Sequence, residues 1–327
     1  MTKQTIKNIG VFTSGGDSPG MNAAIRAVVR TALYYDIKVT GILRGYDGLI
    51  SGDFIPMERK SVANIIQRGG TILKTARSEE FLTKEGRTKA FEQLQSNQID
   101  ALVAIGGDGT FTGANIFYDE FKIPVIGLPG TIDNDLIGTD FTIGYDTAIN
   151  TVVEAVDKIR DTAESHDRLF IVEVMGRDSG LIALRSGIGS GAEAILIPES
   201  KTDLKALLSR LEVSRKDKSS KIIIVAEGDD AGGAFEIAKI VKDKFPLIDT
   251  RVSVLGHIQR GGPPSCMDRV LASRLGVAAV ESLLQGKSAE MIGIVNGKIH
   301  FTPFIHAIKH TTEINSELLK IVDVLSL

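Results

Sequence analysis

Three acidic residues in two short loops carry the strongest chemical signal in this sequence. Asp108 stands in Ile-Gly-Gly-Asp-Gly-Thr at 105–110, and Asp133 and Asp135 stand in Pro-Gly-Thr-Ile-Asp-Asn-Asp at 129–135. Glycines leave backbone amides open to a phosphate, and a carboxylate among phosphates needs a divalent cation between them. The first loop therefore predicts a phosphate site with Mg²⁺ held by Asp108.

The second loop predicts proton transfer. Thr131, Asp133 and Asp135 alternate along the chain, so an extended turn would direct all three side chains to one side. One carboxylate could then act as a base while the other supports it. Either loop alone could be an ordinary connection between a strand and a helix with solvated acids. Two such loops at one sheet edge favour a catalytic site.

The elements that must position these loops follow from two apolar runs. Residues 101–105 and 124–128 are typical of buried parallel strands, and residues 110–118 of a helix between them. A right-handed crossover through that helix places the strands side by side. Both loops then emerge at the carboxyl edge of one sheet, where open α/β sheets bind ligands.

Strand and helix patterns alternate along most of the chain. Residues 9–13 and 39–43 read as strands and 22–34 as a helix, and an amphipathic helix begins near Gly144. A second series follows: strands at 169–174, 194–197 and 221–226, and helices at 179–188, 203–213 and 234–244. The pattern predicts an α/β protein with two doubly wound, mostly parallel sheet domains.

Composition excludes several classes of protein. The chain has 327 residues, 43% hydrophobic, which is enough for two domains. A formal net charge of −3 argues against nucleic acid as the main partner. The single cysteine, Cys266, cannot form an intrachain disulfide, and no apolar run approaches the ~20 residues that span a membrane. Without a signal-peptide pattern, we expect a cytoplasmic protein and no membrane partner.

Basic residues near strand ends predict an anion site in the second half. Arg168, Arg251, His257 and Arg260 together could neutralise a phosphate monoester. Each arginine alone could equally form a surface ion pair, and His257 alone could be a core histidine.

Four motifs resemble those of bacterial-type ATP-dependent 6-phosphofructokinases. They are TSGGDSPGMNAAIR at 13–26, GGDGT at 106–110, PGTIDND at 129–135 and GHIQRGG at 256–262. GGDG also occurs in NAD kinases and lipid kinases, whereas the last two motifs point to phosphofructokinases. The resemblance covers nearly the whole chain. It implies an ATP-binding domain at 1–138 plus 256–305, a fructose 6-phosphate domain at 139–255 plus 306–327, and an active site in the cleft between them.

The resemblance implies transfer of the γ-phosphoryl group of Mg·ATP to the 1-hydroxyl of fructose 6-phosphate, a step of glycolysis. Asp133 would be the base, and the implied catalytic residues are Thr131, Asp133, Asp135 and Arg177. The implied ATP contacts are Gly16, Arg77, Ser78, Gly107, Asp108, Gly109 and Thr110. Ser78 stands where the family often has an aromatic residue, so stacking there is not expected.

The implied fructose 6-phosphate contacts share three residues with the catalytic set, Thr131, Asp133 and Arg177. The full set of contacts is Thr131, Asp133, Arg168, Met175, Gly176, Arg177, Glu227, Arg251, His257 and Arg260. By resemblance, Arg168 and Arg251 reach across from a neighbouring subunit, and Glu227 contacts the sugar hydroxyls. Sites completed by a neighbouring subunit imply at least a dimer, and the resemblance implies a homotetramer.

The resemblance also implies an effector site for ADP or phosphoenolpyruvate at a subunit boundary. Its residues would be Arg26, Arg30, Arg59, Arg160 and Glu193. Arg26 and Arg30 are four residues apart on one expected helix face, which could also be a solvated face.

Three rival functions are open at this point. Pyrophosphate-dependent relatives carry Asp where Gly109 stands and Lys where Gly130 stands, and a carboxylate at 109 would repel an α-phosphate. ATP is therefore the expected donor. A catalytically silent nucleotide sensor would need no base, and an NAD kinase would need no sugar-phosphate cluster.

Overall fold

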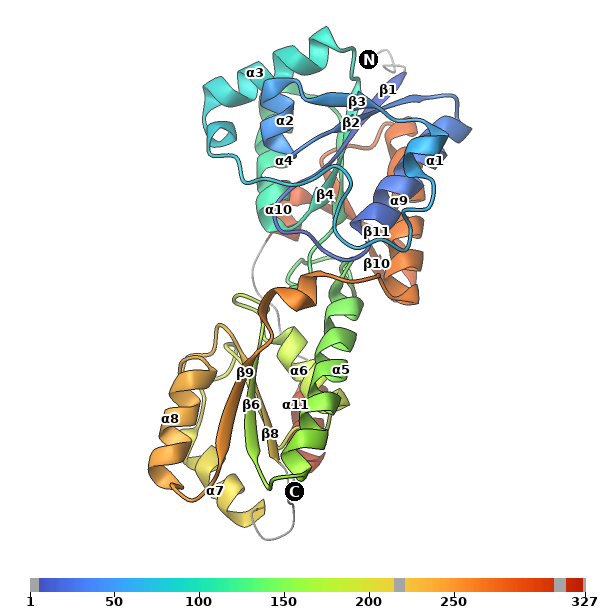
Figure 1. The fold of residues 1–327 in the computed structure, drawn as a ribbon. Coiled ribbons are helices and arrows are strands. Elements are labelled where there is room, and N and C mark those ends of the chain that lie inside the picture. The colour runs from blue at the N-terminus through green and yellow to red at the C-terminus, as the bar shows by residue number, and fades with distance from the viewer. Residues whose placement is uncertain (1–5, 215–220, 309–315, 326–327) are drawn as a thin grey trace. The chain divides into compact units, whose positions relative to one another are not determined.

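A computed structural model describes residues 6–214, 221–308 and 316–325 of the chain (Figure 1). The chain forms two compact units, each assembled from separate stretches. Unit 1 consists of Met1–Thr131, Leu136–Asp146 and Arg260–Thr311. Unit 2 consists of Ile132–Asp135, Thr147–Gln259 and Thr312–Leu327.

Unit 1 contains a seven-stranded sheet in the order β11-β10-β5-β4-β1-β2-β3. The strands are β1 (Asn8–Thr13), β2 (Lys38–Ile42), β3 (Phe54–Pro56), β4 (Ala101–Gly106), β5 (Val125–Pro129), β10 (Glu290–Val295) and β11 (Lys298–Pro303). The strands from β10 to β2 run parallel, and the two edge strands β3 and β11 pair antiparallel with their neighbours. Every residue of β4 and β5 is buried, as expected for central parallel strands.

Helices cover both faces of this sheet (Figure 1). On one face lie α1 (Met21–Tyr34) and α9 (Cys266–Leu284), whose buried residues form one apolar core with the sheet. On the other lie α2 (Tyr46–Ser51), α3 (Lys84–Ser96), α4 (Asp108–Phe121) and α10 (Phe304–Ala307), around a second core. Two single turns of 3₁₀ helix, η1 (Arg59–Val62) and η2 (Glu80–Leu82), lie in the connections.

Unit 2 contains a four-stranded parallel sheet in the order β7-β8-β6-β9. The strands are β6 (Leu169–Val174), β7 (Ala194–Leu196), β8 (Lys221–Ala226) and β9 (Thr250–Val254), followed by the 3₁₀ segment η3 (Gly256–Arg260). One face packs against α7 (Leu204–Ser214) and α8 (Ala234–Lys244). The other carries α5 (Tyr145–Glu164), α6 (Leu181–Gly189) and α11 (Ser316–Leu325) (Figure 1).

The prediction of two mostly parallel α/β sheets is confirmed. The antiparallel edge strands β3 and β11 were not predicted, because β3 has only three residues and β11 lacks a long apolar run. Within the described ranges, no helix is long and apolar enough to cross a membrane.

Candidate active site

The first glycine turn follows β1 and lies against the end of β4. The backbone N–H of Ser14 donates to the carbonyl of Ile105 at 3.0 Å. Arg260 covers this turn: its Nη1 donates to the carbonyl of Asp17 at 3.2 Å. A Cβ added to Gly16 would lie 2.6 Å from the same Nη1. Arg260, predicted to bind the sugar phosphate, therefore contacts the turn predicted to bind ATP.

The second glycine turn joins β4 to α4 and packs against the first. A Cβ on Gly106 would lie 2.3 Å from Thr110 Oγ1 and 2.5 Å from the Ser14 carbonyl oxygen. The buried Thr110 hydroxyl donates to that carbonyl at 3.1 Å. Gly109, by contrast, has no atom within 4 Å of the position of a Cβ. Asp108 is half-buried at the first position of α4, so its carboxylate lies among amides at the positive end of a helix.

The end of β5 lies beside the second glycine turn. The N–H of Gly130 donates to the carbonyl of Gly106 at 3.0 Å. The carbonyl of Thr131 accepts from the Thr142 hydroxyl at 2.7 Å. A Cβ on Gly107 would lie 3.6 Å from the Cβ of Thr131. Gly107 and Thr131 are thus neighbours, as the parallel pairing of β4 with β5 requires.

The acidic loop after Thr131 has a different backbone from the one expected. Asp133 is only 4% exposed, and Asn134 has a left-handed φ of 54°. Side chains alternate only where successive residues are extended, so the expected extended turn is wrong at Asn134. Asp135 is half-buried, and alternation no longer places it on the side of Asp133.

A buried amide anchors the long loop between β3 and α3. Asn22, at the start of α1, is 1% exposed. Its Nδ2 donates to the carbonyls of Arg68 and Gly69 at 3.0 and 3.1 Å, and its Oδ1 accepts from the N–H of Ile72 at 2.8 Å. This loop leads to the residues predicted to contact ATP, and Asn22 was not among the predicted site residues.

The same loop is also tied to the first glycine turn. The Thr75 hydroxyl donates to the carbonyl of Gly15 at 2.6 Å. Two residues later, Arg77 is exposed. The Ser78 hydroxyl accepts from the N–H of Phe81, a residue of η2, at 3.3 Å. The structure thus brings the Arg77 segment to the glycine turn within unit 1.

In unit 2, Glu227 holds the loop that follows β6. Its Oε1 accepts from the backbone N–H groups of Gly176 and Arg177 at 3.2 and 2.7 Å. Both residues have positive φ, 147° and 54°, and the value at Arg177 is unusual for a residue with a side chain. A Cβ on Gly228 would lie 2.2 Å from the Arg177 carbonyl oxygen, so β8 approaches this loop closely.

A second buried amide joins this loop to the segment that carries His257. Gln259 is 0% exposed. Its Oε1 accepts from the N–H of Met175 at 3.3 Å, and its Nε2 donates to the carbonyl of Gly256 at 3.0 Å. The predicted residues Met175, Arg177 and His257 therefore lie on connected segments at the carboxyl end of the small sheet.

Arg168 and Arg251 lie at the opposite, amino end of that sheet. Arg168 Nε donates to Asp249 Oδ2 at 2.7 Å, and Arg251 Nε lies 2.9 Å from Asp249 Oδ1. The hydrogen bond from Arg168, with a smaller effect of Arg251, holds the pKa of Asp249 below its ordinary value. β6 separates Arg168 from Met175 by about 20 Å. Within one chain, the two arginines therefore cannot share a phosphate with His257.

The predicted effector residues fall into two groups. In unit 1, burial and the neighbouring charge of Arg30 lower the pKa of Arg26, and η1, which contains Arg59, packs against α1. In unit 2, Arg160 Nη2 donates to the carbonyl of Ser190, close in sequence to the buried Glu193. A lysine-rich stretch spans residues 215–221, and of these 215–220 lie outside the described residues.

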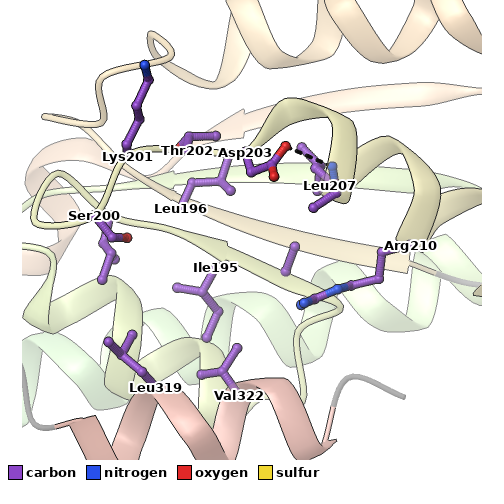
Figure 2. Close-up of a pocket in the computed structure, with 13 residues that line it drawn as sticks. Ile195, Leu196, Ser200, Lys201, Thr202, Asp203, Leu207, Arg210, Leu319 and Val322 are labelled. Carbon is purple, nitrogen blue, oxygen red and sulfur yellow. Dashed lines mark hydrogen bonds between the residues drawn. The ribbon is translucent and has the colours of Figure 1, made fainter.

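A cavity of about 300 Å³ lies in unit 2 at the edge strand β7. Figure 2 shows Ile195 from β7, Arg210 from α7, and Leu319 and Val322 from α11 around it. Its lining mixes apolar residues with polar ones such as Lys201 and Asp203, and its position at the edge strand β7 separates it from the loops described above. None of its lining residues was predicted to belong to a site.

Comparison with known proteins identifies the family to which these loops belong. The pattern of the phosphofructokinase family matches residues 8–283. The chain belongs to the phosphofructokinase family. The match includes both glycine turns, the acidic loop and GHIQRGG, so the resemblance inferred from the sequence is confirmed.

Several curated phosphofructokinases are similar over nearly their whole length. The ATP-dependent 6-phosphofructokinase of Cytophaga hutchinsonii is 58% identical over 322 residues, 98% of each chain. ATP-dependent 6-phosphofructokinase 1 of Thermus thermophilus is 56% identical over 323 residues, 98% of this chain and 100% of its own.

Solved phosphofructokinase structures share the fold. The Saccharomyces cerevisiae enzyme matches with a TM-score of 0.89 and 38% identity over 98% of this chain, which spans 48% of that longer chain. The pyrophosphate-dependent phosphofructokinase of Marinobacter aquaeolei matches with a TM-score of 0.84 over 98% of this chain and 91% of its own. At 24% identity, the second match supports the fold alone.

Proposed function

We propose that this protein transfers the γ-phosphoryl group of ATP to the 1-hydroxyl of fructose 6-phosphate. The observation that carries the proposal is the full-length similarity to proteins named ATP-dependent 6-phosphofructokinase. The loops of both units have the chemistry that this reaction needs. Unit 1 would bind the nucleotide and unit 2 the sugar phosphate.

The nucleotide side is built mainly from main-chain groups. The two glycine turns after β1 and β4 provide amides for the phosphates, and Thr75 ties the Arg77 loop to the first of them. Arg77 would contact the ATP phosphates through charge-assisted hydrogen bonds. Gly16, Gly107, Gly109 and Thr110 would line the same phosphates, with Ser78 at the margin.

Asp108 is the residue that would hold Mg²⁺. The fit is chemical: Asp108 provides a half-buried carboxylate at the first position of α4, next to the glycine turn proposed to bind phosphate. Among the residues that the structure describes, no group of three or more His, Cys, Asp or Glu side chains could form a protein metal site. Mg²⁺ commonly uses one or two carboxylates together with substrate phosphates and water. Bound there, the ion would neutralise charge on the transferring phosphoryl group.

Asp133 would accept the proton of the 1-hydroxyl. Its burial keeps the carboxylate from bulk water, which favours a directed proton transfer over exchange with solvent. Thr131 and Arg177 would orient and neutralise the phosphoryl oxygens, and Asp135 would support the loop. Positioning and charge neutralisation dominate phosphoryl transfer, so these contacts would supply most of the acceleration.

The space around Gly109 supports ATP as the donor. No atom lies within 4 Å of a Cβ at Gly109, which leaves room for the nucleotide beyond its terminal phosphates. Gly130 is crowded instead, because a Cβ there would lie 3.0 Å from Ile105 and 3.1 Å from Met21. The Lys found at this position in pyrophosphate-dependent relatives would require local repacking.

The position of two arginines supports an oligomer. Arg168 and Arg251 lie about 20 Å along the sheet from the loops that carry Met175 and His257. Arg251 pairs with Phe170, about 17 Å from the level of Met175, and both guanidinium groups bind Asp249 at the amino end, so the two arginines would contribute to a sugar-phosphate site from another subunit. We therefore extend the proposal to an assembly of at least two chains, with the tetramer of the family as the expected form.

An effector site for ADP or phosphoenolpyruvate belongs to the same proposal. Burial, and to a smaller extent the like charge of Arg30 on the same helix, lower the pKa of Arg26, and a bound anion would offset that repulsion. Arg59, Arg160 and Glu193 would complete that site at a subunit boundary. If rates at low fructose 6-phosphate do not respond to ADP or phosphoenolpyruvate, this part of the proposal is wrong.

A cytoplasmic location stays a prediction from the sequence.

A donor and acceptor screen on the purified full-length protein tests the proposed function. We expect ADP release only when ATP, Mg²⁺ and fructose 6-phosphate are all present, and little product with pyrophosphate. Turnover with pyrophosphate alone would assign the protein to the pyrophosphate-dependent enzymes. Tight ATP binding with no turnover on any sugar phosphate would favour a sensor.

A further inference from the structure

One fully buried side chain in unit 2 connects two segments assigned above to the sugar phosphate. Gln259 is 0% exposed, and it bonds the N–H of Met175 at 3.3 Å and the carbonyl of Gly256 at 3.0 Å. Arg177 stands two residues after the first contact, and His257 directly follows the second. The amide therefore joins the two chain segments that carry Arg177 and His257.

We propose that Gln259 is a positioning residue for fructose 6-phosphate, which sets the spacing between the Met175–Arg177 loop and His257. It acts through the backbone and does not touch the sugar. The inference deepens the function proposed above and rests on it.

The backbone at both segments explains why such a restraint is needed. Arg177 has a φ of 54° and Gly256 a φ of 53°, both in the left-handed region. Such conformations persist at functional sites when the surroundings hold them in place. A glutamine amide offers an acceptor and donors in one rigid plane, so a single side chain can restrain an N–H and a carbonyl together.

A second restraint limits what loss of Gln259 would do. Glu227 accepts from the N–H groups of Gly176 and Arg177, so the loop keeps two hydrogen bonds without Gln259. Gln259 is also not part of the apolar core that the sheet of unit 2 forms with α7 and α8, so that core does not depend on it. We therefore expect a protein substituted at position 259 to fold, with Arg177 and His257 displaced from their positions.

Gln259→Met tests the inference because it keeps the size of the side chain and removes both hydrogen bonds. Binding of fructose 6-phosphate and of Mg·ADP is measured by calorimetry on the same full-length preparation, together with steady-state kinetics. We expect fructose 6-phosphate affinity to fall at least tenfold, with KM for that sugar rising in parallel. Affinity for Mg·ADP and KM for ATP should stay within about twofold, since Gln259 contacts no nucleotide loop.

Ser186→Ala is the matched control, because Ser186 is another 0% exposed polar residue of unit 2 and bonds only within its own helix. It should change neither affinity. Unchanged fructose 6-phosphate affinity in Gln259→Met, or equal losses for both ligands, would overturn the inference. Wild-type protein that binds no fructose 6-phosphate would instead contradict the proposed function itself.

Gln259→Glu provides a second variant if the methionine variant does not fold. It has the same length and keeps an acceptor for the N–H of Met175, but it cannot donate to Gly256 when ionised. Selective weakening of sugar binding in this variant would support the inference. Failure of both variants to show the cooperative unfolding of the wild type would overturn it, because the amide would then serve the stability of unit 2.

Discussion

The two units present different kinds of groups to their proposed ligands. In unit 1 the phosphate loops are glycine turns, and hydroxyl and amide side chains such as Thr75, Thr110 and Asn22 hold their backbone in place. In unit 2 the loops carry Arg177, Glu227 and His257, so the contacts come from side chains. Each unit has one buried amide, Asn22 or Gln259, that fixes segments distant in sequence.

This difference predicts how the units respond to substitution. A main-chain amide cannot be removed by changing its own side chain, so unit 1 is sensitive to added bulk. A side-chain cation or base can be deleted, so unit 2 is sensitive to lost charge. The predictions below test this contrast from the largest expected effect to the smallest.

The largest effect should come from Asp133, the side chain proposed to accept the proton. Asp133 belongs to unit 2. The variant Asp133→Ser should have a kcat about 10²–10⁴-fold lower than the wild type, with both KM values within a few-fold. A coupled assay for ADP measures this loss. The control Asp119→Ser removes an exposed acid of α4 and should leave turnover unchanged. Near-normal turnover of Asp133→Ser would contradict its role as the base.

Loss of a cation in unit 2 should act on sugar binding. Arg251→Ala should raise KM for fructose 6-phosphate about 10- to 100-fold, because charge-assisted hydrogen bonds contribute roughly 1.5–3 kcal/mol. KM for ATP should not change. Lys242→Ala, which removes an exposed cation from α8, is the matched control and should behave as the wild type.

Subunit mixing sharpens the same prediction. If Arg251 serves a neighbouring subunit, hybrids of Asp133→Ser and Arg251→Ala chains contain some sites with both residues intact. Activity at low fructose 6-phosphate should then exceed the average of the two parents. Activity equal to that average would mean that Arg251 acts within its own chain or not at all.

Added bulk in unit 1 should destabilise its phosphate loops. A Cβ in Gly106→Ala would lie 2.5 Å from the Ser14 carbonyl oxygen, and overpacking of this kind costs about 1–3 kcal/mol of unfolding free energy. Gly109→Ala meets no atom within 4 Å and should keep the wild-type unfolding free energy. Urea titrations compare the two. Equal stability of the variants would show that the turn is looser than its contacts indicate.

A fall in pH should lower the unfolding free energy of unit 1, because it removes the charge from one partner of a partly buried ion pair. Arg87 donates to both carboxylate oxygens of Glu120 at 2.7 Å and holds the pKa of Glu120 below its ordinary value of 4.5. Because the folded-state pKa is the lower one, the pair stabilises above pH 4.5 and loses its effect as pH falls through the folded value. Glu120→Gln should lose about 0.2–1 kcal/mol of unfolding free energy at neutral pH, because solvent screens this pair, and its stability should decline less steeply in acid.

In unit 2, ionisation of Asp229 should change stability in the opposite direction from ionisation of Glu120. Burial raises the pKa of this carboxyl above 3.8, so its ionised form opposes folding at neutral pH. That penalty disappears as pH falls through the raised value. Urea titrations across this pH range should show a small gain at neutral pH for Asp229→Asn, partly offset by loss of one of its bonds to Thr202 and Ala231. A steeper acid decline in both variants would contradict the assigned signs.

The sequence predicted the sheet core and the glycine turns because both leave local patterns. The buried runs of β4 and β5 and the glycines around Asp108 can be read residue by residue. The hydrogen bonds of Asn22 and Gln259 could not be predicted, since Gln259 and Met175 are 84 positions apart and no periodicity links them. Asp249 was missed for the same reason: only the pairing of β6 with β9 brings it between Arg168 and Arg251.

Local backbone conformation was the second source of error. The acidic loop was predicted as extended from its alternating residue types, and the left-handed Asn134 breaks that alternation. Asparagine tolerates this conformation better than most residues, so the sequence contained a usable signal.

The most direct test of the proposed function follows the phosphorus atoms during the reaction. Phosphorus NMR of wild-type protein with Mg·ATP and fructose 6-phosphate should show loss of the γ-phosphate signal and growth of ADP. A second phosphomonoester signal should grow on the 1-position of the sugar at the same rate. Loss of the γ-phosphate to inorganic phosphate alone, or no change with ATP, would contradict the proposed transfer.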